Sequence, residues 1–320
     1  MPPEPLAVFG EVCTAPLPTA VALRRGEIEQ LLELVPGQRA QWRSRPVSLG
    51  ISAQTGEGID CPLAAPAHPV VRAIGTVGVR AVIVGGRVVQ SSSQATIVRS
   101  DSDRRKSWHH YLRELGVVEV ITKVRTDTSV LVAEGFLQPS NTDVLDLTPV
   151  NERLLARIAV GDPSGHDGPP RIGATRLRWA ARVDAVSIPR IAFRVHDEIR
   201  RTALVLVPSE CELTAAQRFF EDLAVHDWLL TAMTGAIERA DLAGPGSEDA
   251  ADILAPVLHH LGHLWAPGAH TPAPLRPLWT QLQDDPGMSV EWSTSVDHLR
   301  NQLVVATWNA LKRSRVGGDM

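Results

Sequence analysis

The first half of the chain alternates apolar and polar residues with the period of β-strands. The clearest case is GTVGVRAVIVGGRVVQSSSQATIVRS at residues 75–100, where every second side chain from Val77 to Ile83 is apolar and falls on one face. Gly85 and Gly86 follow, and glycine readily adopts the positive φ angles that a two-residue hairpin turn needs. The pattern therefore predicts a β-hairpin that turns at these glycines.

Further elements are predicted on either side of this hairpin. Residues 5–15 and 45–52 are typical of strands, whereas residues 26–37 carry apolar side chains at helical spacing. The stretch 116–137 alternates again, and it predicts a second hairpin that turns at Thr126–Ser129. The N-terminal half is thus expected to be rich in strands.

The pattern changes in the second half of the chain. Thr148 and Pro149 open a predicted helix that runs to about residue 160. Residues 161–170, GDPSGHDGPP, are dense in glycine and proline and predict a linker. Strands and then helices are expected after it. The strands cover residues 175–186, 190–197 and 200–208, and the helices cover about 210–240, 249–265 and 289–314.

Together these elements predict an α+β protein with two domains. Residues 1–160 would form a β-rich N-terminal domain with few helices, and residues 161–170 would link it to the second domain. Residues 171–320 would form a short antiparallel sheet that leads into a C-terminal helical bundle. The length of 320 residues exceeds the usual size of one domain and agrees with this division.

Composition and charge narrow the class of protein. With 44% hydrophobic and 21% charged residues the chain is globular, and its net charge of −4 gives no general attraction to nucleic acid or to anionic membranes. The three cysteines are widely spaced and indicate neither a disulfide framework nor a zinc knuckle. We find no signal peptide and no apolar run approaching the roughly 18–20 residues of a membrane span. A soluble cytoplasmic protein without a membrane partner is expected.

Histidine is concentrated in one short stretch, VLHHLGHLW, which places His259 and His263 four residues apart on a predicted helix. His226 on the preceding helix could supply a third imidazole, and neutral imidazoles suit zinc or nickel. This combination loosely resembles the metal-binding four-helix bundles of the DinB type, and the dipeptide His226-Asp227 resembles the HD-type phosphohydrolases. Either resemblance implies a metal-dependent hydrolase or transferase that uses His226, His259 and His263.

Helical geometry opposes this metal-site hypothesis. His226 falls in the middle of an apolar stripe that runs from Phe219 to Ile237, so it is expected to face the core. His259 and His263 fall outside the apolar arc of their own helix. The pattern favours a buried, hydrogen-bonded histidine and a separate polar helix face, and no cofactor is expected.

The loop at residues 101–115, DSDRRKSWHHYLREL, mixes basic and aromatic side chains. Such a mixture can hold phosphates and stack on bases, but acidic neighbours offset the charge, so nucleic-acid binding is a third hypothesis only. Arginine, tryptophan and tyrosine are also frequent hot spots of protein interfaces. The basic and aromatic residues that we take as an interaction surface are Arg104, Arg105, Lys106, Trp108 and Tyr111.

Two tryptophans in the helical part extend this predicted interaction surface. Trp228 and Trp308 both lie off the apolar stripes of their own helices. An off-stripe tryptophan on an amphipathic helix suggests a second buried surface, either between domains or between chains. The two residues therefore indicate assembly rather than catalysis.

Several segments, in the order GEVCTAPLPT, GIDCPL, TRLRWAA, FFEDLAVHDWLLTA and HLWAPGA, resemble an uncharacterised family of actinobacterial proteins. The resemblance spans most of the chain. It implies a component of a multi-protein system encoded beside a variant P-loop ATPase, and it carries no catalytic residues. It thus implies other proteins as partners, with that ATPase among them.

The functional expectation follows from these observations. The chain lacks a P-loop, a G-x-S-x-G elbow and an H-E-x-x-H motif. The leading hypothesis is a non-enzymatic interaction or scaffold component, and self-association remains open. The alternatives are the metal-dependent hydrolase or transferase and, third, nucleic-acid binding through the 101–115 loop.

Overall fold

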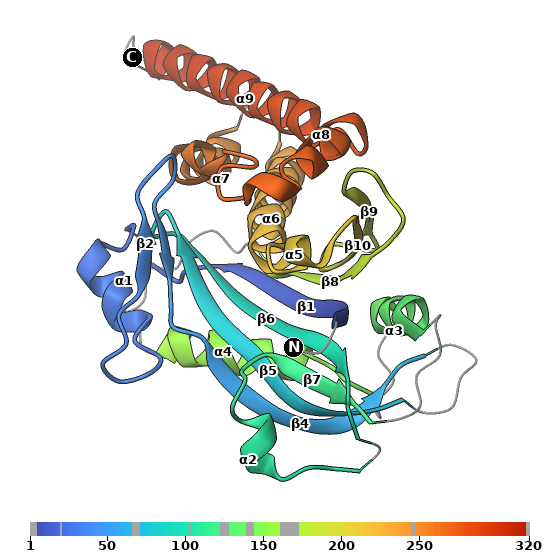
Figure 1. The fold of residues 1–320 in the computed structure, drawn as a ribbon. Coiled ribbons are helices and arrows are strands. Elements are labelled where there is room, and N and C mark those ends of the chain that lie inside the picture. Colours follow the sequence, from blue (N-terminus) through green and yellow to red (C-terminus); the bar gives the residue numbers. More distant parts are fainter. Residues whose placement is uncertain are drawn as a thin grey trace.

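One sheet of ten strands runs through the molecule, and helices lie on both of its faces (Figure 1). The computed structural model describes residues 5–19, 21–65, 71–102, 104–121, 128–138, 144–160, 173–244 and 247–317. The strands are β1 (Pro5–Pro16), β2 (Gln41–Arg43), β3 (Leu49–Ile51), β4 (Thr55–Leu63), β5 (Val71–Val84), β6 (Val88–Arg99), β7 (Val117–Val120), β8 (Thr175–Val183), β9 (Arg190–Val195) and β10 (Arg200–Val207). The helices are α1 (Arg25–Leu31), α2 (Trp108–Tyr111), α3 (Thr128–Leu137), α4 (Thr148–Val160), α5 (Glu210–Leu213), α6 (Ala216–Ala243), α7 (Glu248–Leu261), η1 (Gly262–Leu264), η2 (Ala273–Leu275), α8 (Pro277–Asp284) and α9 (Met288–Gly317).

The predicted α+β class is confirmed, with a β-rich N-terminal region followed by a helical C-terminal region. The hairpin at residues 75–100 is also confirmed, as β5 pairs antiparallel with β6 up to the pair Val84 and Val88. Gly85 and Gly86 make the turn with φ angles of 59° and 66°. The two glycines therefore adopt the left-handed conformation that their position requires.

The second predicted hairpin is wrong. β7 is a strand, but residues 128–137 form the helix α3, and the expected turn at Thr126–Ser129 lies partly outside the described residues. Within α3, Val132 and Phe136 are buried at helical spacing, and the ring of Phe136 stacks on Phe9 of β1 with 4.7 Å between centroids. A short apolar run is compatible with the period of a strand and with that of a helix, and here its packing against the sheet stabilises the helix.

The strands on either side of residues 161–170 belong to the same sheet. β8 pairs antiparallel with β1, so that Ala180 lies opposite Phe9, and β10 and β9 extend the sheet beyond β8. β8 and β10 are parallel, whereas β10 and β9 are antiparallel. The expected short antiparallel sheet is therefore the edge of one mixed sheet. The linker itself lies outside the described residues.

Each face of the sheet has its own apolar core. Figure 1 shows α6, α7, α8 and α9 on one side of the sheet and α4 on the other. The core under α6 includes Trp179 and Phe220, whose rings stack with 4.5 Å between centroids. The opposite core includes Phe9 together with Leu154 and Ile158 of α4. Because both faces are covered, the central strands are buried on both sides.

Candidate functional site

The histidine of α6 is a structural residue of the core. His226 is 2% exposed, and its Nδ1 lies 2.6 Å from the backbone oxygen of Asp222. Its Nε2 accepts a hydrogen bond of 3.0 Å from the backbone N–H of Ala266. These two bonds fix the neutral tautomer that carries its proton on Nδ1. Burial lowers the pKa of His226 to about 4, so the ring is neutral at pH 7.

The other two candidate ligands lie elsewhere on the helical region. His259 and His263 are exposed side chains, and the ring of His259 makes an edge-to-face contact with His260, 4.8 Å between centroids. His226 has the inward position that its apolar stripe predicts, with both ring nitrogens hydrogen-bonded inside the chain. In the described part of the chain, no group of three histidine, cysteine or acidic side chains could hold a metal ion.

Acidic partners offset the basic residues of the 101–115 loop. The Lys106 ammonium lies 2.6 Å from Asp101 and 3.3 Å from Glu119. His110 also approaches Glu119, at 2.5 Å. Hydrogen bonds from His110, Ser100 and Lys106 lower the pKa of Glu119 despite its burial, so this carboxylate is ionised at neutral pH. The loop thus presents little of the uncompensated positive charge that phosphate binding requires.

The two arginines of this loop differ in their contacts. Both arginines are exposed, and Arg105 lies 3.4 Å from Asp60 and stacks over the ring of Trp108, 5.3 Å from its centroid. Trp108 is 39% exposed and could contribute contact area. Tyr111 is buried, and its hydroxyl accepts a hydrogen bond of 3.0 Å from the backbone N–H of Lys106. Tyr111 therefore holds the loop in place and does not belong to a contact surface, contrary to the prediction.

Trp228 lies on a second buried face of its helix, as its off-stripe position predicts, but that face packs inside the chain and is not a surface for another protein. Its side chain is fully buried in the core that includes α6 and the sheet, and its Nε1 donates to the backbone oxygen of Gly173 at 2.9 Å. The helix α6 is buried on nearly every side over its first turns, because the sheet covers one side and α7 and α9 pack on another. Trp228 lies off the apolar stripe because its helix has more than one packed face.

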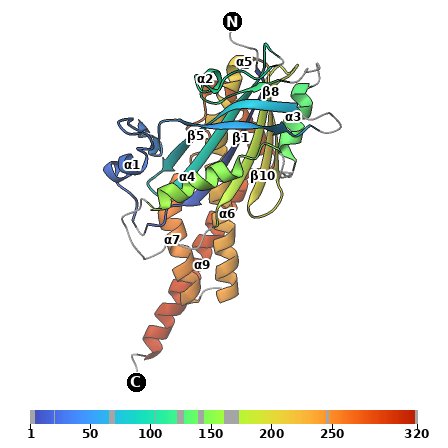
Figure 2. The same ribbon diagram turned by 90° about the horizontal axis from the view of Figure 1, so that it is seen from below.

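Trp308 differs from Trp228, because it is exposed near the end of α9. Figure 2 shows that the last turns of α9 extend beyond the ends of α6 and α7. On this part of the helix Val304 is 68%, Trp308 57% and Leu311 55% exposed. These three residues, spaced four and three apart, define the surface that we call the α9 stripe. Their spacing is that of the apolar seam of a coiled coil.

From Arg300 onward the charged side chains beside the α9 stripe are basic. Arg300 precedes the stripe and lies 3.9 Å from Asp297, and Lys312 follows the stripe with its ammonium 5.3 Å from the centroid of the Trp308 ring. The sequence holds no acidic residue between Asp297 and the end of α9 at Gly317. The exposed apolar seam is thus bordered by basic side chains at both ends.

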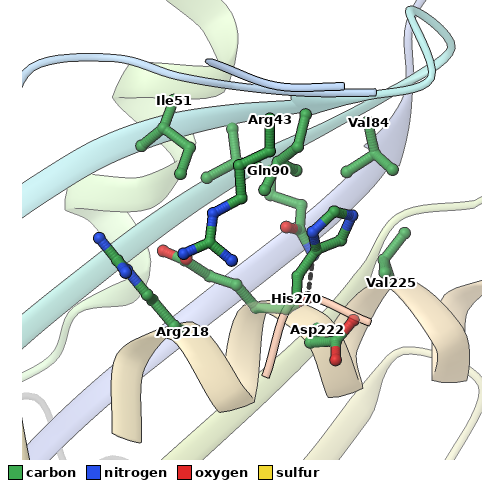
Figure 3. A pocket seen from close by; sticks show the side chains of 11 residues that line it. Arg43, Ile51, Val84, Gln90, Arg218, Asp222, Val225 and His270 are labelled. Atoms are coloured by element: carbon green, nitrogen blue, oxygen red, sulfur yellow. Dashed lines mark hydrogen bonds between the residues drawn. The ribbon is translucent and has the colours of Figure 1, made fainter. Parts of the chain in front are cut away.

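A pocket that the sequence did not indicate lies between the sheet and the first turns of α6 (Figure 3). Arg43 at the end of β2, Arg218 and Asp222 of α6, and His270 in the segment between η1 and η2 all line it. Positions 43, 218 and 270 are far apart in the sequence and share no motif. Only the packing of α6 on the sheet brings these side chains together, so no local pattern could have revealed them.

Hydrogen bonds fix Asp222 on one side only. Its Oδ2 accepts from the Thr271 hydroxyl at 2.6 Å, and that hydroxyl in turn accepts from Nε1 of Trp279 at 2.8 Å. Its Oδ1 makes no hydrogen bond of good geometry among the described residues and lies 3.6 Å from Nδ1 of His226. Burial raises the pKa of Asp222 to about 6, against the opposing effects of the Thr271 hydroxyl and His270. A buried carboxylate with a pKa near neutrality is a frequent feature of functional pockets.

No family model, curated protein or solved structure matches this chain. Among the helices that the structure describes, none combines the length and the apolar character needed to cross a membrane.

Proposed function

We propose that this protein is a non-enzymatic interaction component that binds a helical segment of another protein through the α9 stripe. A single observation carries the proposal: Val304, Trp308 and Leu311 are each more than half exposed at coiled-coil spacing. Exposed apolar side chains in one contiguous seam are typical of a protein contact, and tryptophan is among the most frequent interface hot spots. A partner helix would bury this seam in the manner of helix-in-groove recognition.

The charges that border the stripe favour a partner with acidic residues. If a second copy docked on the stripe, either antiparallel or parallel, its basic residues would come close to Arg300 and Lys312. Like charges at close range oppose such a dimer. An amphipathic helix with acidic residues beside its apolar seam is complementary to this surface. We place the complex in the cytoplasm, and the resemblance to actinobacterial proteins makes a co-encoded P-loop ATPase the first partner to test.

We expect that substitutions in the stripe abolish complex formation without unfolding the chain. Trp308→Glu and Val304→Glu place a carboxylate in the seam, where a docked helix would have to bury it unpaired. Complexes of the purified chain with each co-encoded protein would be measured by size-exclusion chromatography with light scattering. The wild-type chain alone is expected to be a monomer, and both variants are expected to lose the complex that the wild type forms.

Val195→Glu is the matched control, because Val195 of β9 is also an exposed valine, at 56%. This variant should retain the complex. A complex that survives Trp308→Glu, or that is lost equally in Val195→Glu, would contradict the proposal. If the chain alone formed a stable dimer and Trp308→Glu abolished that dimer, the partner that binds the stripe would be a second copy of this chain.

A further inference from the structure

We propose that the pocket between the sheet and α6 binds a small organic carboxylate, held by the guanidinium groups of Arg43 and Arg218. This site lies on a different part of the molecule from the α9 stripe, and the inference does not depend on the interaction proposal. Figure 3 shows the labelled side chains of Arg43, Arg218 and His270 gathered around the pocket, with Ile51, Val84 and Val225 on its apolar walls.

Two of the three arginines at this pocket make no direct ion pair. Arg80 of β5 makes a two-pronged ion pair with Glu221 of α6, with both N–O distances at 2.7 Å. Arg43 and Arg218, by contrast, make no hydrogen bond or ion pair with any described residue. Burial lowers the pKa of Arg218, and the like charges of Arg43 and Arg80 lower it further, against the opposing effect of Glu221. Two guanidinium groups that repel each other are expected to hold an anion between them.

Unpartnered buried atoms indicate that a polar group belongs in this pocket. His270 is 8% exposed, and neither of its ring nitrogens makes a hydrogen bond of good geometry in the described part of the chain, although the backbone of Val47 lies close enough to raise the pKa of the ring. Buried polar atoms are almost always hydrogen-bonded, so a polar group from outside the protein is expected to satisfy them. The charged end of a ligand could accept a hydrogen bond from the N–H of this imidazole.

Size and charge identify the class of ligand. The pocket is partly open to solvent, and the space inside it that a water-sized group can occupy is about 20 Å³, so it has room for one small polar group and the rest of a ligand would lie toward the solvent. The carboxylates of Glu221 and Asp222 lie in the same pocket, so a dianion such as phosphate would meet more repulsion than a monoanion. A carboxylate can bind to a guanidinium through two hydrogen bonds, and a short alkyl group on it would contact Ile51 and Val84.

The test is a titration with sodium butanoate, followed by calorimetry and ligand-observed NMR. Butanamide, a neutral molecule of nearly the same shape, and inorganic phosphate are the comparison ligands. We expect the wild type to bind butanoate, to bind phosphate more weakly, and not to bind butanamide measurably. Arg43→Gln and Arg218→Gln should each weaken butanoate binding about tenfold, the usual loss for a charge-assisted hydrogen bond.

Arg194→Gln is the matched control, because Arg194 is an exposed arginine on β9, at the opposite edge of the sheet from β2. It should bind butanoate as the wild type does, and so should Trp308→Glu, which separates this inference from the interaction proposal. The absence of butanoate binding, or equal binding by Arg43→Gln, Arg218→Gln and the wild type, would overturn the inference. Tighter binding of phosphate than of butanoate would overturn the choice of a carboxylate.

The affinity for butanoate should also rise as the pH falls from 7.5 to 5.5. Asp222 faces His226 on its own helix, and His270 and Thr271 from the segment between η1 and η2. Protonation of either member of the Asp222–His270 pair makes the pocket more positive, whereas an alkyl carboxylate with a pKa of about 4.3 stays ionised. We expect a gain of about threefold or more over this range.

The variant Asp222→Asn tests the role of this carboxylate. It should bind butanoate more tightly than the wild type at pH 7.5, and its affinity should change less between pH 7.5 and 5.5. An affinity for butanoate that changes with pH as much as in the wild type, or more, would contradict the role of Asp222.

Discussion

Replacing Asp227 with alanine is expected to lower the free energy of unfolding by about 3–5 kcal/mol, because it leaves a buried arginine without its counter-charge. Asp227 of α6 accepts a hydrogen bond of 2.7 Å from Nε of Arg201 on β10, and both side chains are less than one-tenth exposed. Arg201 also donates to the Thr231 hydroxyl at 2.7 Å and to the backbone oxygen of Asp197. These contacts fix the helix α6 to β10, the strand next to the edge of the sheet.

Two controls test whether the loss of stability comes from leaving a buried charge unpaired, rather than from losing an ion pair in general. The pair of Asp297 and Arg300 on α9 is exposed, with 3.9 Å between its charged atoms. Asp297→Ala should therefore cost less than about 1 kcal/mol. The double variant Arg201→Met with Asp227→Leu removes both buried charges and should recover much of the stability that Asp227→Ala loses. Urea denaturation measures all three variants, and equal losses for Asp227→Ala and Asp297→Ala would contradict the prediction.

Replacing Trp179 with alanine should also cost about 3–5 kcal/mol, the usual loss when a large buried aromatic side chain is removed. Trp179 of β8 is fully buried, and its ring stacks on Phe220 of α6 at an interplanar angle of 17°. On the other strand, Gly10 of β1 makes room for the ring, because a Cβ atom there would lie 2.2 Å from it. Trp179 thus joins β1, β8 and α6 in one packed layer.

Trp308→Ala is the matched control for Trp179→Ala. Trp308 is mostly exposed and its only ring contact described is with Lys312 on the same helix, so its removal should change stability by less than about 1 kcal/mol. Thermal and urea unfolding of the two variants measure the difference. If Trp308→Ala destabilised the chain as much as Trp179→Ala does, α9 would be part of the core and the α9 stripe would not be a free surface.

The fold was predictable where one period dominated the sequence. The hairpin at residues 75–100 has strict alternation and two glycines at the turn, and the long C-terminal helices follow from sustained apolar stripes. Residues 128–137 were not predictable in this way, because ten residues of mostly apolar character fit a buried strand and a helix equally well. The pairing of β8 with β1 joins segments that are far apart in the sequence, and no local pattern specifies such a contact.

The candidate sites likewise divide into residues whose position a local pattern predicts and residues whose position depends on packing between distant segments. The inward position of His226 followed from its place in an apolar stripe, whereas the pattern could not tell whether the second buried face at Trp228 packs inside the chain or against another protein. Stripe geometry assumes a helix with a single packed face, and that assumption holds for the projecting end of α9 but fails for α6. The pocket of Arg43 and His270 arises from segments that meet only in the folded chain, so its discovery required the structure.

Photo-cross-linking from the α9 stripe tests the central claim most directly. A photoreactive phenylalanine derivative would replace Trp308 in one strain of the native host and Val195 in another, and cross-linked peptides would be identified by mass spectrometry. We predict that position 308 captures one discrete partner through a helical, acidic segment of another protein, and that position 195 does not. Capture of the same species from both positions, or no cross-linked species from position 308, would contradict the claim.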